Sequence, residues 1–112
     1  MLNRRKYIRF KTSLDAKCFS LNGDPVSDHV QITNMSREGV RFTAKETLTK
    51  GDRVSLEVSL PGEEETFPVA AEVTWAVFGN GVCNAGVHFK YIDPTSRFKM
   101  LDYAFYSATG SA

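Results

Sequence analysis

Cationic side chains are concentrated at the beginning of the sequence. Arg4, Arg5, Lys6, Arg9 and Lys11 all precede the first acidic residue. The whole chain has 14 Lys and Arg against 13 Asp and Glu, a formal net charge of +1. A nearly neutral chain with one cationic segment is expected to direct that segment at an anionic partner. The alternative is a solvated basic terminus without a ligand.

Two of these cations are spaced so that they face the same target. Arg5 and Arg9 are four positions apart, which places them on one face of either a helix or an extended strand. A guanidinium group donates paired hydrogen bonds to phosphate oxygens, and its flat face stacks on a base. The spacing therefore favours a compact ligand that carries both phosphates and planar rings.

A second polar cluster occurs at Asn34-Met35-Ser36-Arg37-Glu38-Gly39. On an extended segment Asn34 and Ser36 share a face, where an amide and a hydroxyl offer both donors and acceptors. Gly39 is expected either to allow a turn with positive φ or to let a ligand approach the backbone closely. These residue types are also common in ordinary turns, so the cluster alone indicates little.

Taken together, the two clusters resemble the PilZ family, the bacterial receptor domains for the second messenger cyclic di-GMP. That family is marked by RxxxR near its start and (D/N)xSxxG further along; here these are Arg5–Arg9 and Asn34–Gly39. Segments 39–42, 56–60, 69–75 and 86–89 also look like strands of the family. The resemblance covers essentially the whole chain.

The resemblance implies a function and a set of binding residues. Cyclic di-GMP would be gripped by an N-terminal arm that is mobile without ligand and folds over it, which would change the surface shown to an effector protein. In the family, an Arg at the position of Arg4 is associated with a stacked pair of ligands in place of one. Asn34 stands where Asp is commoner, which would lower the affinity. The candidate binding residues are Arg4, Arg5, Arg9, Asn34, Ser36, Arg37 and Gly39.

The hydrophobic pattern predicts a mainly β single domain over residues 1–112. We expect a small antiparallel barrel of six or seven strands at 14–92, preceded by a basic arm at 1–13 and followed by a helix at 93–108. The expected strands are 14–21, 30–33, 40–43, 54–60, 67–77 and 85–91. Gly79-Asn80-Gly81 is a hairpin signal.

Alternation also predicts which side chains face the core. In the strand at 67–77 the inner face would hold Val69, Ala71, Val73, Trp75 and Val77, which makes Trp75 a core residue; the alternative is that Trp75 stacks on a base. In the last strand it would hold Ala85, Val87, Phe89 and Tyr91. In the helix, Asp93-Pro94 resembles an N-cap followed by Pro. Phe98, Leu101, Phe105 and Ala108 form a stripe that would cover the barrel or, alternatively, a partner.

Several classes of function are disfavoured. No apolar run is long enough to span a membrane and no signal peptide is visible, so we expect a cytoplasmic protein with two free thiols, Cys18 and Cys83. His29 and His88 have no partner at metal-ligand spacing, and we expect neither a metal nor a cofactor. No catalytic motif is present, so we expect no enzyme.

Three functional classes remain from the sequence. The first is a cyclic di-GMP receptor. The second is a PilZ-like module that docks a protein without binding nucleotide, which would be expected to lack Arg5, Arg9 or Ser36; all three are present. The third is a small barrel that binds nucleic acid, which is disfavoured because the strand aromatics alternate as core and the net charge is low.

Overall fold

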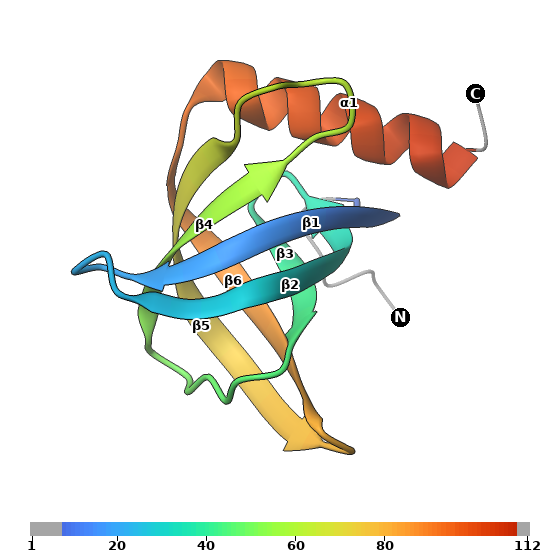
Figure 1. Ribbon diagram of the computed structural model, residues 1–112. Coiled ribbons are helices and arrows are strands. Elements are labelled where there is room, and N and C mark those ends of the chain that lie inside the picture. The colour runs from blue at the N-terminus through green and yellow to red at the C-terminus, as the bar shows by residue number, and fades with distance from the viewer. Residues whose placement is uncertain (1–7, 110–112) are drawn as a thin grey trace.

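Six antiparallel strands close into a barrel, and one helix follows them (Figure 1). The computed structural model describes residues 8–109. The order around the barrel is β1-β2-β3-β6-β5-β4, and pairing of β1 with β4 closes it. The elements are β1 (Phe10–Ser20), β2 (Pro25–Ser36), β3 (Gly39–Ala44), β4 (Arg53–Ser59), β5 (Phe67–Gly79), β6 (Val82–Ile92) and α1 (Pro94–Thr109). The predicted small antiparallel barrel with a C-terminal helix is confirmed, and it has six strands.

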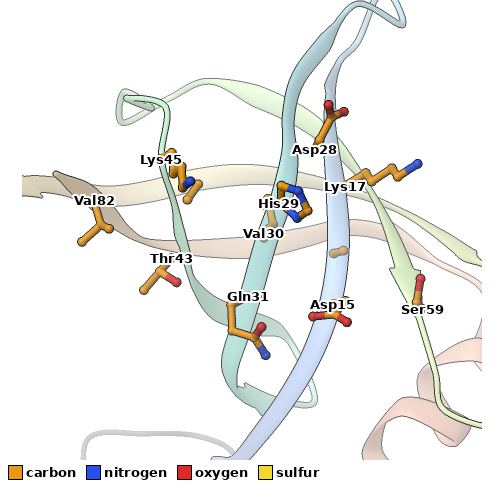
Figure 2. A pocket seen from close by; sticks show the side chains of 12 residues that line it. Asp15, Lys17, Asp28, His29, Val30, Gln31, Thr43, Lys45, Ser59 and Val82 are labelled. Carbon is orange, nitrogen blue, oxygen red and sulfur yellow. The ribbon is translucent and has the colours of Figure 1, made fainter.

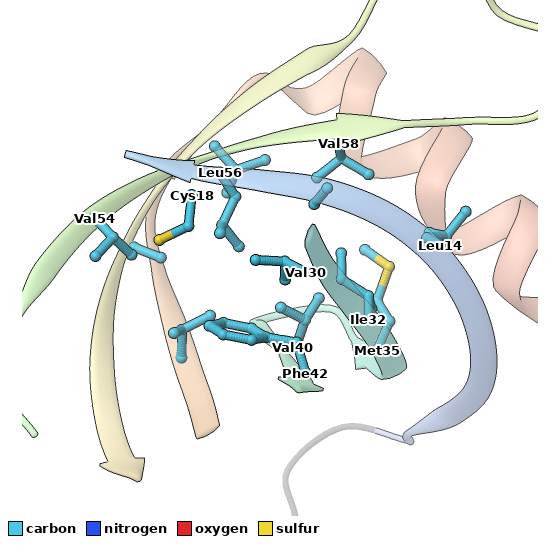
Figure 3. Packing of buried hydrophobic residues seen from close by; sticks show 14 of the residues in the cluster. Leu14, Cys18, Val30, Ile32, Met35, Val40, Phe42, Val54, Leu56 and Val58 are labelled. Atoms are coloured by element: carbon cyan, nitrogen blue, oxygen red, sulfur yellow. The ribbon is translucent and has the colours of Figure 1, made fainter. Parts of the chain in front are cut away.

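The barrel interior is filled mainly by aliphatic side chains, with the phenyl rings of Phe42 and Phe89 among them. Leu14, Ile32, Val40, Phe42 and Leu56 come from four different strands and are almost completely buried, as Figure 3 shows. Each comes from a position that alternates with polar residues, which is what a strand with one wet face requires. Cys18 and Cys83 also lie in this core and are free thiols, as expected.

The strands are longer than the sequence predicted. β1 begins at Phe10, so residues 10–13 belong to the barrel rather than only to an arm. β2 begins at Pro25 instead of at position 30, because polar Ser27 and Asp28 conceal its alternation. The hairpin at Asn80-Gly81 is confirmed: both residues have positive φ, 55° and 81°, which is the type I′ turn that a two-residue hairpin prefers.

Two register shifts between β5 and β6 explain why the sequence pattern assigned some residues of these strands to the core that are in fact exposed. One falls between Val73 and Trp75, and the other between Ala70 and Ala71. A bulge inserts one residue and reverses which side chains face inward. Val69, Ala71 and Val73 are buried as predicted, but Trp75 and Val77 are exposed. On β6 the prediction for Tyr91 is also wrong, since Ile92 is buried in its place.

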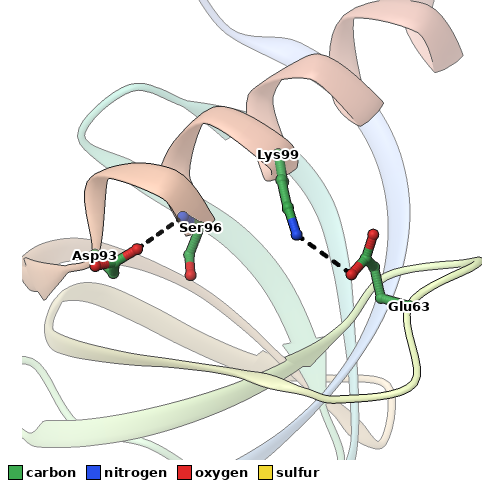
Figure 4. Close-up of polar contacts among 4 residues, drawn as sticks. All are labelled: Glu63, Asp93, Ser96 and Lys99. Carbon is green, nitrogen blue, oxygen red and sulfur yellow. Dashed lines mark hydrogen bonds and ion pairs between the residues drawn. The ribbon is translucent and has the colours of Figure 1, made fainter.

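Helix α1 starts as the sequence predicts. The Asp93 carboxylate accepts hydrogen bonds from the backbone N–H groups of Thr95 and Ser96, at 3.0 and 3.2 Å, which is an N-cap (Figure 4). The Nζ of Lys99 lies 3.4 Å from Oε1 of Glu63 in the β4–β5 loop. This exposed ion pair adds little stability. Among residues 8–109 no helix is long and apolar enough to cross a membrane.

The helix covers one end of the barrel with a different face from the one expected. Met100 and Ala104 are fully buried and belong to the core. Phe98, by contrast, is 68% exposed and Phe105 is also exposed, so the predicted stripe is wrong at these two positions, whereas Leu101 is partly buried against the core. The side chain of Ala108 lies outside the described residues. The error arose because the aromatic residues outweighed smaller Met and Ala in the pattern, although Met100 and Ala104 are the helix side chains that fit deepest against the closely packed strands.

Candidate ligand-binding site

Arg9 lies against β2 and contacts both polar residues of the second cluster. Its Nε and Nη2 donate to Oδ1 of Asn34, at 2.9 and 2.6 Å, and its Nη1 donates to Oγ of Ser36 at 3.3 Å. Ser36 is buried, and its Oγ also accepts from the backbone N–H of Glu38 at 3.3 Å. The two clusters that the sequence separated by 25 positions therefore form one site in the fold.

The outer surface beside Arg9 is a row of residues that runs across four strands. Asn34 on β2 pairs with Arg41 on β3, Arg41 pairs with Gly86 on β6, and Gly86 pairs with Trp75 on β5. Directly paired residues on neighbouring strands share a face, with side chains close enough to interact. We call Asn34, Arg41, Gly86 and Trp75 the binding row.

Gly86 brings the two large side chains of the row together. A Cβ atom at Gly86 would overlap the indole of Trp75, so the indole occupies the space above that backbone. The Cζ of Arg41 lies 5.4 Å from the centre of the Trp75 ring, within the range of a cation–π contact. Trp75 remains 37% exposed, so the ring is a surface platform and the prediction of a core residue is wrong.

A small hollow lies between Arg9 and the binding row. It measures about 120 Å³ and is lined by Arg9, Val40, Arg41, Thr74, Trp75, Gly86 and Val87. Two guanidinium groups line it and no carboxylate does, so its potential favours an anion. Buried Nε of Arg41 makes no hydrogen bond within residues 8–109, which leaves a donor unmatched. The hollow is well below the ~300–1,000 Å³ of an enclosing site, so it would receive part of a larger ligand.

Gly39 serves the barrel itself. It does not have positive φ, so the turn conformation expected for it is not observed. It pairs with His88 on β6, and a Cβ atom here would overlap the carbonyl oxygen of Val87. Its missing side chain is therefore required for β3 to approach β6. That approach places Arg41, two residues later, opposite Gly86.

The other predicted binding residues lie elsewhere or outside the description. Arg37 is exposed and lines an apolar groove of about 480 Å³ with Ile8, Phe10, Phe98, Leu101, Asp102 and Phe105, on the side of α1. Arg37 does not line the hollow beside Arg9. Arg4 and Arg5, and with them the expected grip of the arm, lie outside the described residues.

A larger hollow of about 410 Å³ lies over β1, β2 and β3 (Figure 2). Its side chains include Asp15, Lys17, Asp28, His29 and Lys45, so charges of both signs surround it. None of the predicted binding residues lines it. Within residues 8–109 no group of three His, Cys, Asp or Glu residues is placed to hold a metal ion.

Arg41 is the site residue that the sequence reasoning missed, and for Trp75 it considered base stacking only as the alternative to a core position. A signal for Arg41 was present: it alternates with the inward-facing Val40 and Phe42 directly after the second cluster. For Trp75 the alternation favoured a core position over base stacking, because its exposure depends on the register shift after Val73.

Comparison with known proteins agrees with the fold. The family model of the PilZ domain matches residues 3–106, whereas comparison with curated proteins gives no match. Among solved structures, the Bacillus subtilis inhibitor of motility MotI/DgrA is similar with a TM-score of 0.77 and 18% identity, over 98% of this chain and 54% of that one.

Two further structures contain a nucleotide. The PilZ domain of Escherichia coli YcgR with c-di-GMP is similar with a TM-score of 0.72 and 16% identity, over 96% of this chain and 93% of that one. The K. pneumonia MrkH–c-di-GMP complex is similar with a TM-score of 0.70 and 16% identity, over 100% of this chain and 57% of that one. The chain thus spans about half the length of MotI/DgrA and of MrkH. With a family match over nearly its whole length and the fold that goes with it, the chain belongs to the PilZ domain family.

Proposed function

We propose that this chain is a receptor for cyclic di-GMP, which binds over the hollow between Arg9 and the binding row. The observation that carries the proposal is the convergence of Arg9, Arg41 and Trp75 on one small hollow that no carboxylate lines. Cyclic di-GMP has two phosphates and two guanines, and these three side chains match both kinds of group. PilZ neighbours solved with c-di-GMP support the choice of ligand.

The two guanidinium groups would bind the anionic and polar edges of the ligand. Arg donates bidentately either to phosphate oxygens or to O6 and N7 of guanine. Because Oδ1 of Asn34 accepts two bonds from Arg9, its Nδ2 group is directed elsewhere and serves as an additional donor. Asn34 and Ser36 also hold Arg9 in place before the ligand arrives, which reduces the ordering cost of binding.

The exposed indole of Trp75 would stack on one guanine. Base–aromatic stacking is worth about 1–3 kcal/mol, and Arg41 already lies over this ring. The guanidinium of Arg41 can therefore bind a phosphate while the base covers the free part of the indole. In this arrangement the ligand lies across the barrel surface, with only part of it in the hollow.

Arg5 and Arg4 would complete the site from the segment before Ile8. If that segment continues as an extended chain, Arg5 shares the face of Arg9 and reaches the second phosphate or guanine. The family resemblance, and not this spacing, gives Arg4 the role of holding a second, stacked cyclic di-GMP molecule; because adjacent side chains of an extended segment point to opposite sides, the chain would have to turn between Arg4 and Arg5. Folding of the arm over the ligand is the change that would pass the signal to an effector protein.

The surface through which the signal could pass includes α1. In an extended segment adjacent side chains point to opposite sides, and Arg9 faces the binding row while Ile8 and Phe10 line the groove beside α1. The Phe10 ring contacts the Phe105 ring, with centroids 5.8 Å apart. A shift of Arg9 on binding would therefore also move the wall of this apolar groove, and an effector bound in the groove would respond to that movement.

Isothermal titration calorimetry with cyclic di-GMP tests the proposal. Wild type should bind, and Arg9→Ala should bind about 10- to 150-fold more weakly, because a charged hydrogen bond contributes roughly 1.5–3 kcal/mol. Arg37→Ala is the matched control, since this exposed Arg lies outside the hollow and should retain most of the affinity. The stoichiometry, one or two, decides the role of Arg4.

If calorimetry showed no heat of binding and saturating cyclic di-GMP gave no thermal stabilisation, the proposed receptor function would be wrong. The second candidate, a module that only docks a protein partner, would then be the better account. The presence of Arg5, Arg9, Asn34 and Ser36 in one chain favours the receptor over that alternative.

A further inference from the structure

Part of strand β5 has an unpaired edge. β4 pairs with β5 only from Phe67 to Glu72, and the last bonds on that side join Val73 to Gly51 and Asp52. β5 itself continues to Gly79, paired on its other side with β6. Figure 1 shows this end of the β5–β6 hairpin projecting from the barrel. Within residues 8–109 no strand pairs with this outer side of residues 74–79, which we call the open edge.

Backbone groups on the open edge point away from β6. Gly79 and Val82 close a type I′ hairpin and exchange hydrogen bonds, and bonded pairs then alternate along the ladder. Val77 therefore bonds to Asn84, whereas the N–H and C=O groups of Ala76 and Phe78 are directed to the open side. These groups form a template for another strand.

The side chains of the open edge do not protect it. Exposed strand edges are normally blunted by charges or Pro, but residues 74–79 are Thr-Trp-Ala-Val-Phe-Gly. Val77 is 63% exposed and Phe78 is 49% exposed. The other long hairpin differs: the part of β2 that β3 does not cover carries Pro25 and Asp28. The uncovered part of β2 is thus protected against pairing with another strand, whereas the open edge of β5 is available for it.

We propose that the open edge is a dimerisation surface that pairs antiparallel with the same edge of a second copy. A twofold axis brings identical segments together in opposite directions, which is the geometry of an antiparallel ladder. No charge lies between Thr74 and Gly79, so two copies meet without like-charge repulsion, and Val77 of each copy extends the apolar contact. This proposal does not depend on nucleotide binding, although Trp75 belongs to both surfaces.

The contact is short, so the dimer is expected to be weak. Two edges of only six residues each bury less than the ~1,200 Å² of a standard interface, which places the complex among transient ones. The oligomeric state should therefore change with protein concentration rather than stay fixed.

Sedimentation velocity of the full chain without nucleotide, from about 5 to about 500 µM, tests this. Wild type should shift from monomer to dimer. Val77→Lys places a charge on the open edge and should remain monomeric. Because Val77 is exposed, this substitution should leave the fold intact. Ala76→Pro removes one outward N–H and should also remain monomeric, whereas Ala76→Ser retains that N–H and should dimerise.

A wild-type chain that stays monomeric throughout would overturn the proposal and leave an extended segment of another protein as the candidate occupant. A Val77→Lys variant that dimerises as wild type does would overturn it as well. If Val77→Lys is monomeric but Ala76→Pro folds and still dimerises, the two copies do not pair through backbone hydrogen bonds. The dimer would then be held by side-chain contacts alone, and the proposed strand pairing would be wrong. If Ala76→Pro fails to fold by its thermal melt, Val77→Lys decides.

Discussion

Arg41 and Trp75 meet across a strand that separates them. β3 and β5 are not neighbours in the barrel, yet the Arg41 guanidinium carbon lies 5.4 Å from the centre of the Trp75 ring. Gly86 on the intervening β6 makes this possible because it has no side chain between them. A cation–π contact at an exposed site is worth about 0.5–1 kcal/mol. Its main effect here is therefore to fix the positions of two groups that a nucleotide would contact.

Gly86→Ala tests the role of this arrangement. The new methyl group would overlap the indole, so Trp75 must move away, while the ladder bonds of β6 remain. We expect cyclic di-GMP affinity to fall about tenfold, the low end of a lost stacking contact. Thermal stability should change by about 1 kcal/mol or less, since the side chain displaced lies on the surface. Unchanged affinity in calorimetry would contradict a role for Trp75.

Gly39→Ala should mainly lower the stability of the fold, in contrast to Gly86→Ala, which should mainly lower the affinity for the ligand. Here the methyl group would overlap the Val87 carbonyl, which is backbone and cannot rotate away. We expect a loss of about 1–3 kcal/mol or more in the free energy of unfolding, as for other overpacked sites. Urea unfolding monitored by circular dichroism measures this loss. A variant as stable as wild type would show that β3 and β6 are less closely held than described.

The buried face of α1 can be tested by a matched pair of substitutions. Met100 is fully buried, so Met100→Ala should lower the free energy of unfolding by about 2–5 kcal/mol. Phe98 is larger but exposed, and Phe98→Ala should change it by about 0.5 kcal/mol or less. Urea unfolding of both variants separates the two faces. A larger loss for Phe98 would support the stripe that the sequence suggested.

Stability above pH 9 should report the environment of Cys18. Burial, with smaller effects from Asp52 and Glu46, raises the pKa of this thiol from 9.0 to about 11. Between these values the unfolded chain ionises first, so the stabilisation is complete below pH 9 and is lost as the pH rises towards 11. Over this range wild-type stability should fall more steeply than that of Cys18→Ala. Parallel pH profiles in urea unfolding would contradict the raised pKa.

Local sequence pattern was sufficient for most of the barrel and for half of the site. Alternation at Val54, Leu56 and Val58 predicts β4 nearly to the residue, and the Asn80-Gly81 signal identifies the hairpin. The contact between Arg9 and Asn34 was predictable from the two short motifs that contain them, because the barrel brings the chain segments that carry these motifs side by side.

The rest of the site depends on features that a single strand does not encode. The bulge between Val73 and Trp75 reverses the inner face, so strict alternation wrongly assigns Trp75 to the core. The contact of Trp75 with Arg41 requires knowing that β6 lies between β3 and β5, which is a property of the closed barrel. For α1, burial is decided by how closely Met100 and Ala104 fit the strands, and hydrophobic spacing alone does not resolve this.

The intrinsic fluorescence of Trp75 gives the most direct test of the proposed receptor. Trp75 is the single Trp of the sequence and belongs to both the binding row and the open edge, so its emission is followed at a low protein concentration, where the chain is expected to be monomeric. Cyclic di-GMP should quench it saturably, with the dissociation constant found by calorimetry, and Arg9→Ala should shift the curve about 10- to 150-fold to higher concentration. N-acetyltryptophanamide controls for absorption by the nucleotide. Calorimetric binding without any change in Trp75 emission would place the ligand elsewhere, and no binding by either method would contradict the account.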